Sequence, residues 1–283
     1  MADGNDFLFD EETIDLFKEP ENYYPPEPEP VFETFERHDE NIESGDTVKT
    51  LTVRLLGHHP LWGHLLWNAA KEFSHFIDRH PSLVRNKAVL ELGAGAALPS
   101  LLAGLNGARR VVVTDYPEES LLDNIRGNVE RILPEAYVDN RVQVQGFLWG
   151  TDPTPLLAAI QPPRQSVAAA SDGDSIGGVP VKFDTLILCD LIFNHSQHRA
   201  MLQTCRACLS DDPAHPGEAY VFFTHHRPHY MQQDLAFFTL AASPEFGFKV
   251  DNFRNISTVP MFEKDPGSPT VRGTVHCYRL TWA

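Results

Sequence analysis

The sequence predicts an α/β fold in which a doubly wound sheet ends in an antiparallel pair of strands. Apolar runs typical of buried parallel strands alternate with helical segments through the middle of the chain. A turn of small residues follows the first of these runs, and two strand-like segments close the sequence. A sheet of this kind binds its ligand beyond the carboxyl ends of its strands.

Two elements are predicted before the first buried strand. Apolar and polar residues alternate over 47–56 as in a strand, and the apolar face carries Leu51, Val53 and Leu55. Residues 60–70 lead into a helix whose apolar positions keep helical spacing at Leu66, Ala70, Phe73 and Ile77. Because Trp62 and Trp67 are five residues apart, they are not expected to face one core direction together. One of them is expected to line the ligand cleft.

The central unit of the prediction spans residues 88–115. An apolar strand at 88–90 leads through Glu91 into a turn of small residues, which comprises Gly93, Ala94, Gly95, Ala96 and Ala97. Backbone N–H groups in such a loop can approach a ligand closely and point at a negative group. The loop therefore predicts a binding site for a ligand with an anionic group.

A helix and a second strand complete this unit. Pro99 suits the first turn of a helix, and Gly107 suits its end. The β-branched strand 111–114 then delivers Asp115, twenty residues beyond Gly95. An acid at this position can accept both hydroxyls of a ribose. The βαβ unit thus predicts a ligand that contains adenosine.

Two ligand classes match this unit to different degrees. The dinucleotide fingerprint requires a third glycine where this chain has Leu98. Glu91 suits instead the E-x-G-x-G pattern of S-adenosylmethionine (AdoMet) enzymes, whose third glycine is replaced here by Ala97, a milder change. The pattern favours AdoMet as the ligand. The alternative is that the loop binds no ligand and is only a turn in an α/β domain.

Helices and strands continue to alternate after Asp115. The apolar stripes and β-branched runs predict, in order, a helix at 118–133, strands at 142–147 and 183–189, a helix at 197–209, a strand at 220–224, a helix at 231–242 and closing strands at 246–253 and 271–282. The continuous apolar run at 183–189 is typical of a strand at the centre of a parallel sheet.

Acidic residues gather in the first 46 positions. This segment holds sixteen Asp or Glu against Lys18 and Arg37, so most of the net charge of −16 lies there. We predict an acidic arm over 1–46 that is either solvated or docked on its own domain or a basic partner. An AdoMet-binding domain is predicted over 47–283, interrupted by a disordered insertion of low complexity at 161–180.

Composition excludes several classes of function. The domain shows no basic face for direct nucleic-acid binding, and no apolar run reaches the length of a membrane helix. Four cysteines without a dense pattern predict a reducing compartment, and a cytoplasmic location is expected. No metal site is expected, because Cys205 and Cys208 lie on an apolar stripe and the histidines at 225–229 lack a carboxylate at metal spacing.

Four segments are expected to meet at the carboxyl edge of the sheet. These are the loop at 93–97, Asp115, Trp149 and the pair Cys189-Asp190. Asp115 would hold the ribose, Trp149 would cover the adenine, and the small Cys189 would leave room beside the ring.

Polar residues that follow Cys189 are candidates for the chemistry. Asp190, Asn194 and His195 would border the sulfonium and the incoming nucleophile. Alternatively, Asp190 is only the N-cap of the helix that follows.

Several motifs in this order resemble the family-16 seven-β-strand protein methyltransferases. They are WNAA at 67–70, ELGAG at 91–95, Asp115, LWG at 148–150 and CD at 189–190. The stretches LFKEPENYYPPEP, HPLWGHLLWNAAKE, DLIFNHSQH and FFTHHRP resemble more narrowly the fungal branch of N-terminal and lysine methyltransferases of elongation factor 1-alpha. This branch has also been labelled nicotinamide N-methyltransferase-like.

The resemblance implies a Rossmann-like, seven-stranded methyltransferase sheet and AdoMet as cofactor. It places the AdoMet contacts on Trp67, Gly93, Ala94, Gly95, Asp115, Trp149 and Cys189. The resemblance thereby selects Trp67 over Trp62 as the tryptophan that contacts AdoMet. Many relatives have Asp-x-x-Tyr where this chain has Asp190 and Phe193, so the role of a tyrosine hydroxyl is not carried over.

The resemblance also implies the acceptor. We hypothesise a monomer that methylates the N-terminal glycine and the adjacent lysine of translation elongation factor 1-alpha, by in-line attack of a neutral amine. Asp190, Asn194 and His195 are the candidate catalytic residues, and the acidic arm is expected to guide a basic substrate terminus. The alternatives are a small-amine methyltransferase acting on nicotinamide and a non-catalytic AdoMet-binding adaptor.

Overall fold

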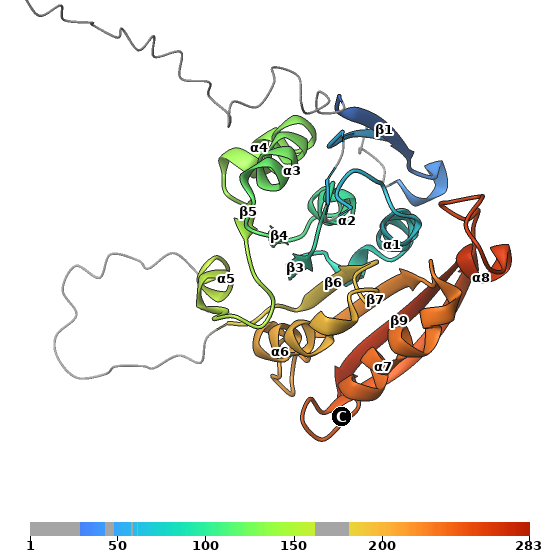
Figure 1. Cartoon of the computed structure of the whole chain (residues 1–283). Helices are drawn as coiled ribbons and strands as arrows, with labels where there is room; N and C mark the ends of the chain where they lie inside the picture. Colours follow the sequence, from blue (N-terminus) through green and yellow to red (C-terminus); the bar gives the residue numbers. More distant parts are fainter. Residues whose placement is uncertain (1–28, 43–47, 58, 61, 162–180) are drawn as a thin grey trace, which may run out of the picture.

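A seven-stranded sheet crosses the molecule, with helices on both faces (Figure 1). The computed structural model describes residues 29–42, 48–57, 59–60, 62–161 and 181–283, so nearly all of the insertion expected at 161–180 lies outside the described residues. The sheet order is β5 (Val142–Gly146), β4 (Arg110–Asp115), β3 (Ala88–Leu92), β6 (Thr185–Cys189), β7 (Glu218–Thr224), β9 (Thr274–Trp282) and β8 (Phe248–Ser257).

The middle strands of this sheet are covered on both faces. Strands β5, β4, β3, β6 and β7 run parallel, and every residue of β3 and β6 is buried, as expected for a parallel sheet between helical layers. Strand β9 is antiparallel to β7 and to β8. The doubly wound α/β prediction with an antiparallel closing pair is confirmed, and the structure adds that the last strand enters between β7 and β8.

The sheet separates the buried side chains into two clusters. Helices cover each face of the sheet (Figure 1). One face is covered by α1 (Asn68–Arg79), α2 (Leu98–Leu105) and α3 (Glu119–Ile132). The other face is covered by α5 (Thr154–Ala158), α6 (His198–Cys208) and α7 (Met231–Ala241). Two short helices, α4 (Pro134–Val138) and α8 (Pro269–Arg272), precede β5 and β9. No helix in the described ranges is long and apolar enough to cross a membrane.

Two element boundaries differ from those expected. Helix α1 begins only at Asn68, because the residues between 62 and 66 form turns instead of the first helical turn. The closing strand begins at Thr274 and not at residue 271, because Pro269 starts the short helix α8. Strand β8 spans 248–257, and its pairing with β9 shifts register at a bulge between Asn252 and Arg254.

A part of the segment expected to be an acidic arm belongs to the folded body. Strand β1 (Val31–Glu36) pairs antiparallel with β2 (Thr50–Leu55), and the alternating face predicted for β2 is buried. Arg37, which follows β1, forms a buried ion pair with Asp78 of α1, at 2.9 Å between Nε and Oδ2. This part of the arm therefore docks on its own domain, whereas residues 1–28 lie outside the described residues.

Candidate active site

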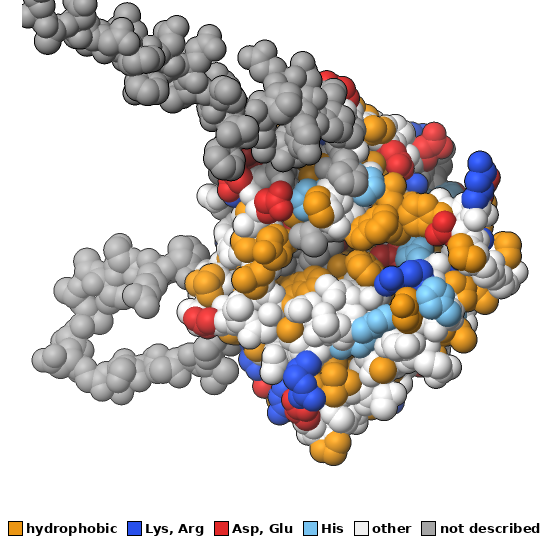
Figure 2. All heavy atoms as spheres, viewed as in Figure 1, with side chains coloured by type: hydrophobic (Ala, Val, Ile, Leu, Met, Phe, Trp, Pro, Cys, Tyr) orange, Lys and Arg blue, Asp and Glu red, His pale blue; other side chains and the backbone are white. Residues whose placement is uncertain are grey.

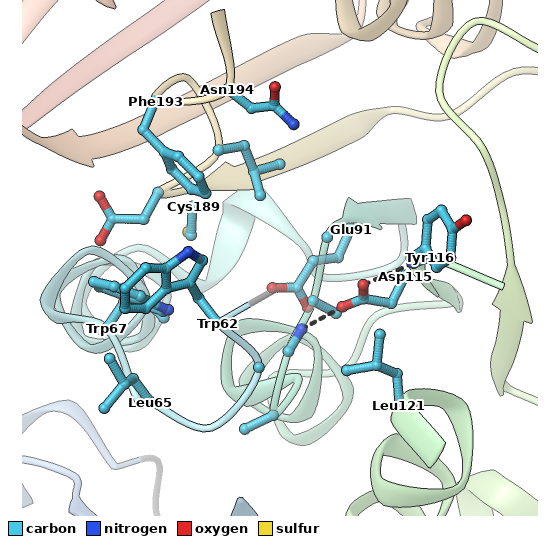
Figure 3. Close-up of a pocket in the computed structure, with 18 of the residues that line it drawn as sticks. Trp62, Leu65, Trp67, Glu91, Asp115, Tyr116, Leu121, Cys189, Phe193 and Asn194 are labelled. Carbon is cyan, nitrogen blue, oxygen red and sulfur yellow. Dashed lines mark hydrogen bonds between the residues drawn. The ribbon is translucent and has the colours of Figure 1, made fainter. Parts of the chain in front are cut away.

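A cavity of about 740 Å³ lies beyond the carboxyl ends of the central strands. Figure 2 shows hydrophobic side chains around a hollow on the viewed face, with histidine and basic side chains nearby. The volume falls within the range of small-molecule sites. The cavity is lined by the turn before α1, the loop after β3, and the segments that follow β4, β5, β6 and β7 (Figure 3). The ligand position expected from the strand ends is thus the position of this cavity.

Three residues of the loop after β3 adopt left-handed backbone conformations. Gly93, Gly95 and Ala97 have φ values of +59°, +56° and +63°. A Cβ atom at Gly93 would lie 2.5 Å from Cδ2 of Leu191 and 3.3 Å from the ring of Trp149. Glycine is therefore required at position 93, both by the backbone angle and by the close approach. Gly93, Ala94 and Gly95 all line the cavity, as predicted for a loop that meets a ligand.

Asp115 stands at the end of β4 and bonds to the loop. Its Oδ2 accepts the backbone N–H of Gly95, and its Oδ1 accepts the N–H of Tyr116, both at 2.7 Å (Figure 3). Burial raises the pKa of this carboxyl above its usual value, and the two N–H donors oppose that shift. A carboxylate has about four acceptor positions, so two remain for the hydroxyls of a ribose.

Glu91 lies beneath the same loop and is 1% exposed. Its Oε2 accepts hydrogen bonds from the backbone N–H of Ser100, at 3.1 Å, and from the Ser100 hydroxyl. Burial raises the pKa of Glu91 to about 8, so the side chain is mostly protonated at neutral pH. Glu91 thus connects β3 to the first turn of α2 and holds the loop between them.

Both tryptophans of the segment before α1 line the cavity. Their ring centroids are 6.4 Å apart in an edge-on arrangement, and both residues are labelled in Figure 3. The expectation that only one of them would line the cleft is wrong. It assumed a helical relation between Trp62 and Trp67, whereas turns precede Asn68 and bring the two rings to the same side. Trp62 is 47% exposed.

Asp190 follows β6 directly and is held in a strained backbone conformation, with φ +51°. Its Oδ1 accepts the backbone N–H of Thr224 at 2.9 Å and lies 3.2 Å from Nε2 of His226. Its Oδ2 is buried and has no hydrogen-bond partner within the described part of the chain. The alternative that Asp190 caps a helix is wrong, because α6 begins at His198 with Gln197 in the capping position.

The structure places the other two candidate catalytic residues, Asn194 and His195, in different surroundings. Asn194 lines the cavity with Asp190, but His195 is not among the lining residues. The Nε2 atom of His195 lies 2.7 Å from Oδ1 of Asp234, whose Oδ2 lies 2.6 Å from Nδ1 of His225. The structure therefore does not bring His195 to the acceptor side of the cavity, because the carboxylate of α7 holds its ring elsewhere.

Trp149 and Cys189 line the cavity from the ends of β5 and β6. Burial raises the pKa of the Cys189 thiol well above its ordinary value, so the side chain is a small neutral wall. Together with Phe147, they give the cavity an apolar side that suits the ring of an adenine. No group of three His, Cys, Asp or Glu residues among those described is arranged to hold a metal ion.

The lining residues that were not among the candidates include Tyr116, Phe193 and Arg227. All three follow the carboxyl ends of predicted strands, so the rule that located Asp115 could also have found them. Arg227 places its guanidinium 4.9 Å from the ring centroid of Tyr230. This residue brings a positive charge to the rim that also carries Asp190.

Comparisons with known proteins show the family. A family model described as lysine methyltransferase matches residues 50–163. The protein N-terminal and lysine N-methyltransferase EFM7 of Candida glabrata is 41% identical over 272 residues, which cover 96% of this chain and 97% of the relative. The protein of that name from Schizosaccharomyces pombe is 38% identical over 283 residues, with 99% and 98% covered. The chain belongs to this family of protein N-terminal and lysine N-methyltransferases.

Membership in the protein N-terminal and lysine N-methyltransferase family makes the chain a methyltransferase. The O-methyltransferase of Bacillus cereus, solved in complex with SAH, has a TM-score of 0.45 and 15% identity, with 78% of this chain and 84% of that chain covered. The cavity itself fits AdoMet. The turn at Gly93 leaves no room for a side chain, Asp115 keeps acceptor positions for a ribose, and an apolar wall adjoins both.

Proposed function

We propose that this protein methylates the N-terminal glycine and the adjacent lysine of translation elongation factor 1-alpha, in the cytoplasm and as a monomer. The observation that carries the proposal is the identity of about 40% over nearly the full length with relatives named for N-terminal and lysine methylation. The motifs FFTHHRP and DLIFNHSQH, which resemble the branch acting on elongation factor 1-alpha, support the choice of acceptor.

We assign AdoMet to the side of the cavity formed by the loop after β3. Asp115 would bind the ribose hydroxyls, and the adenine would lie beside Trp149 and Cys189. The methionine part would lie along the turn, and the proposed contacts there are Trp67, Gly93, Ala94 and Gly95. AdoMet supplies a methyl group that an amine nitrogen takes by forming an N–C bond, while the C–S bond breaks and its electron pair stays on sulfur.

The amine must lose a proton before it can attack. A free α-amine, with a pKa of about 8, loses its proton more readily than a lysine at about 10.4. The unpartnered Oδ2 of Asp190 suits an ammonium group, because it is a buried acceptor at the cavity wall. We infer that Asp190 orients the amine and accepts its proton, which then passes to solvent, and that Asn194 contributes a second polar contact. His195 would act only through Asp234, as a positioning residue.

Mass spectrometry of the N-terminal peptide of elongation factor 1-alpha tests this function. The purified protein is incubated with the factor and labelled AdoMet, and nicotinamide is offered in a parallel reaction. Label on the N-terminal glycine and adjacent lysine is the expected result. Label on nicotinamide alone would favour the small-amine alternative, whereas AdoMet binding without transfer to either acceptor would favour the adaptor. An Asp190→Asn variant serves as the control for transfer by a contaminating enzyme.

A further inference from the structure

Four aromatic rings form one group beside the cavity, and we name them the aromatic cluster: Trp62, Trp67, His226 and Phe262. Two of them, Trp62 and Trp67, line the cavity itself. Ring centroids lie 6.4 Å apart for Trp62 and Trp67, 6.5 Å for Trp62 and Phe262, and 6.1 Å for Trp67 and Phe262. His226 lies 4.9 Å from Trp67 and 6.4 Å from Phe262. Segments far apart in the sequence therefore meet in one group of rings.

The aromatic cluster adjoins Asp190. Among the described residues, Asp190 is the one cavity-lining carboxylate with a buried oxygen that has no hydrogen-bond partner. Trp62 and Trp67 line the cavity with Asp190, and His226 connects the two features, since its Nε2 lies 3.2 Å from Oδ1 of Asp190. The second oxygen of Asp190 remains without a partner. Aromatic faces and an unpartnered acceptor thus border the same part of the cavity.

Phe262 is held in the cluster by the loop between β8 and β9. Buried Arg272 donates a hydrogen bond to the backbone carbonyl of Phe262. The side chain of Asn68, at the start of α1, donates to the carbonyl of Val259 at 2.7 Å and so joins this loop to the turn that carries Trp67. The loop is therefore attached on both sides, and the position of Phe262 is set by these contacts.

Trp62 is exposed and strained at the same time. It is 47% exposed and has a φ of +64°, a left-handed conformation that residues other than glycine rarely adopt. Strained backbone positions of this kind cluster at active sites and ligand-binding positions.

These features suit a methylated ammonium group. Aromatic faces attract a cation through the ring quadrupole, and carboxylates attract it by charge. Methylation removes N–H donors but keeps the positive charge, so that the attraction to the rings survives when hydrogen bonds are lost. A neutral group of the same shape would lack this attraction.

We propose that the aromatic cluster binds the N-methylated ammonium group of the acceptor and so retains a partly methylated chain for further transfer. This inference rests on the proposed function for the identity of the acceptor, but the binding preference itself does not. The ligand class is a mono-, di- or trimethylated ammonium, and the discriminating feature is its positive charge.

Choline and its neutral isostere 3,3-dimethylbutan-1-ol test the cluster without any peptide. We expect choline to bind roughly 2- to 30-fold more tightly by calorimetry, the range that corresponds to cation–π contacts of about 0.5–2 kcal/mol. Phe262→Leu keeps an apolar side chain without a ring and should reduce the preference, with unchanged affinity for S-adenosylhomocysteine. Phe32→Leu, in an exposed side chain of β1, is the matched control and should keep it. Equal binding of the two probes to the unmodified protein would overturn the proposal.

A second measurement examines retention with the N-terminal peptide of elongation factor 1-alpha. The peptide is capped either with trimethylglycine or with its neutral isostere 3,3-dimethylbutanoyl, and the tighter binding of the charged cap should depend on Phe262. The Phe262→Leu variant should also release a larger share of monomethylated product at low turnover. Preference for choline with no methylation of the peptide would refute the proposed acceptor and leave the cluster standing. Methylation without any charge preference would refute the cluster alone.

Discussion

The Oδ2 atom of Asp115 accepts the backbone N–H of Gly95 at 2.7 Å. The acid that is expected to bind a ribose therefore also holds the loop that is expected to face the methionine part of AdoMet. The two halves of the proposed cofactor site are coupled by this hydrogen bond, so a change at Asp115 affects both.

Asp115→Asn should weaken the binding of S-adenosylhomocysteine about 10- to 100-fold, because hydrogen bonds to a charged group contribute roughly 1.5–3 kcal/mol. Isothermal titration calorimetry measures this change directly. Asp139→Asn, in an exposed carboxylate outside the cavity, is the matched control and should bind as the unmodified protein does. Unchanged affinity of the Asp115 variant would remove this residue from the cofactor site.

Glu91 should make stability depend on pH. Its pKa is about 8 in the folded state against an ordinary value of 4.5 for a glutamate, so the folded state keeps a proton that the unfolded state loses. The contribution of Glu91 to the free energy of unfolding is therefore lost as the pH rises from about 4.5 to about 8. Inside that window the loss is roughly 1.4 kcal/mol per pH unit.

Urea unfolding at pH 5.5, 6.5 and 7.5 tests the effect of Glu91. Glu91→Gln, which carries no titrating proton, should flatten the dependence by that amount. Glu130→Gln, in an exposed position of α3, should leave the slope as it is. Parallel curves for the unmodified protein and the Glu91 variant would show that Glu91 is ionised in both states.

Asp190→Asn should lower kcat about 100-fold, because the amide cannot accept the proton of an incoming ammonium. Asn keeps a carbonyl oxygen for the N–H of Thr224, so the local fold should persist. Affinity for S-adenosylhomocysteine should change less than about threefold, and methyl incorporation measures kcat. A variant with normal kcat would show that Asp190 is not the group that receives the amine.

His195→Ala should act on stability more than on chemistry. The ring is held by Asp234 outside the cavity, and its loss leaves a nearly buried carboxylate with one hydrogen bond fewer. We expect a loss of about 1–3 kcal/mol in unfolding free energy and a kcat within about threefold. A 100-fold fall in kcat with normal stability would instead restore His195 to the catalytic residues.

The acidic arm is best tested by removing residues 1–28 rather than 1–46. The shorter deletion takes away nine carboxylates and Lys18 but keeps Arg37, whose ion pair with Asp78 is buried. If the arm attracts a basic substrate, KM should rise several-fold at low salt and the difference should shrink at high salt. An arm with its acids changed to Asn and Gln should match the deletion. If the deletion variant and the full-length protein have the same KM at low salt, electrostatic steering by the arm is refuted.

Much of the fold and part of the site were determined by the sequence itself. The order of strands and helices, the turn at Gly93 and the places of Asp115, Trp149 and Asp190 follow from local hydrophobic period and from the rule that ligands meet strand ends. These features depend on residues close together in the chain, and the structure brings those three residues to one cavity.

Only the tertiary structure decided the features that depend on packing between distant segments. Turns before α1 brought both tryptophans to the cavity, Asp234 of α7 held His195 away from it, and β9 entered between β7 and β8. The unpartnered oxygen of Asp190 and the contact between Trp67 and Phe262 arise in the same way. A hydrophobic pattern reports which residues are buried, but the partner that each polar or aromatic side chain finds is set by the packing of the whole chain.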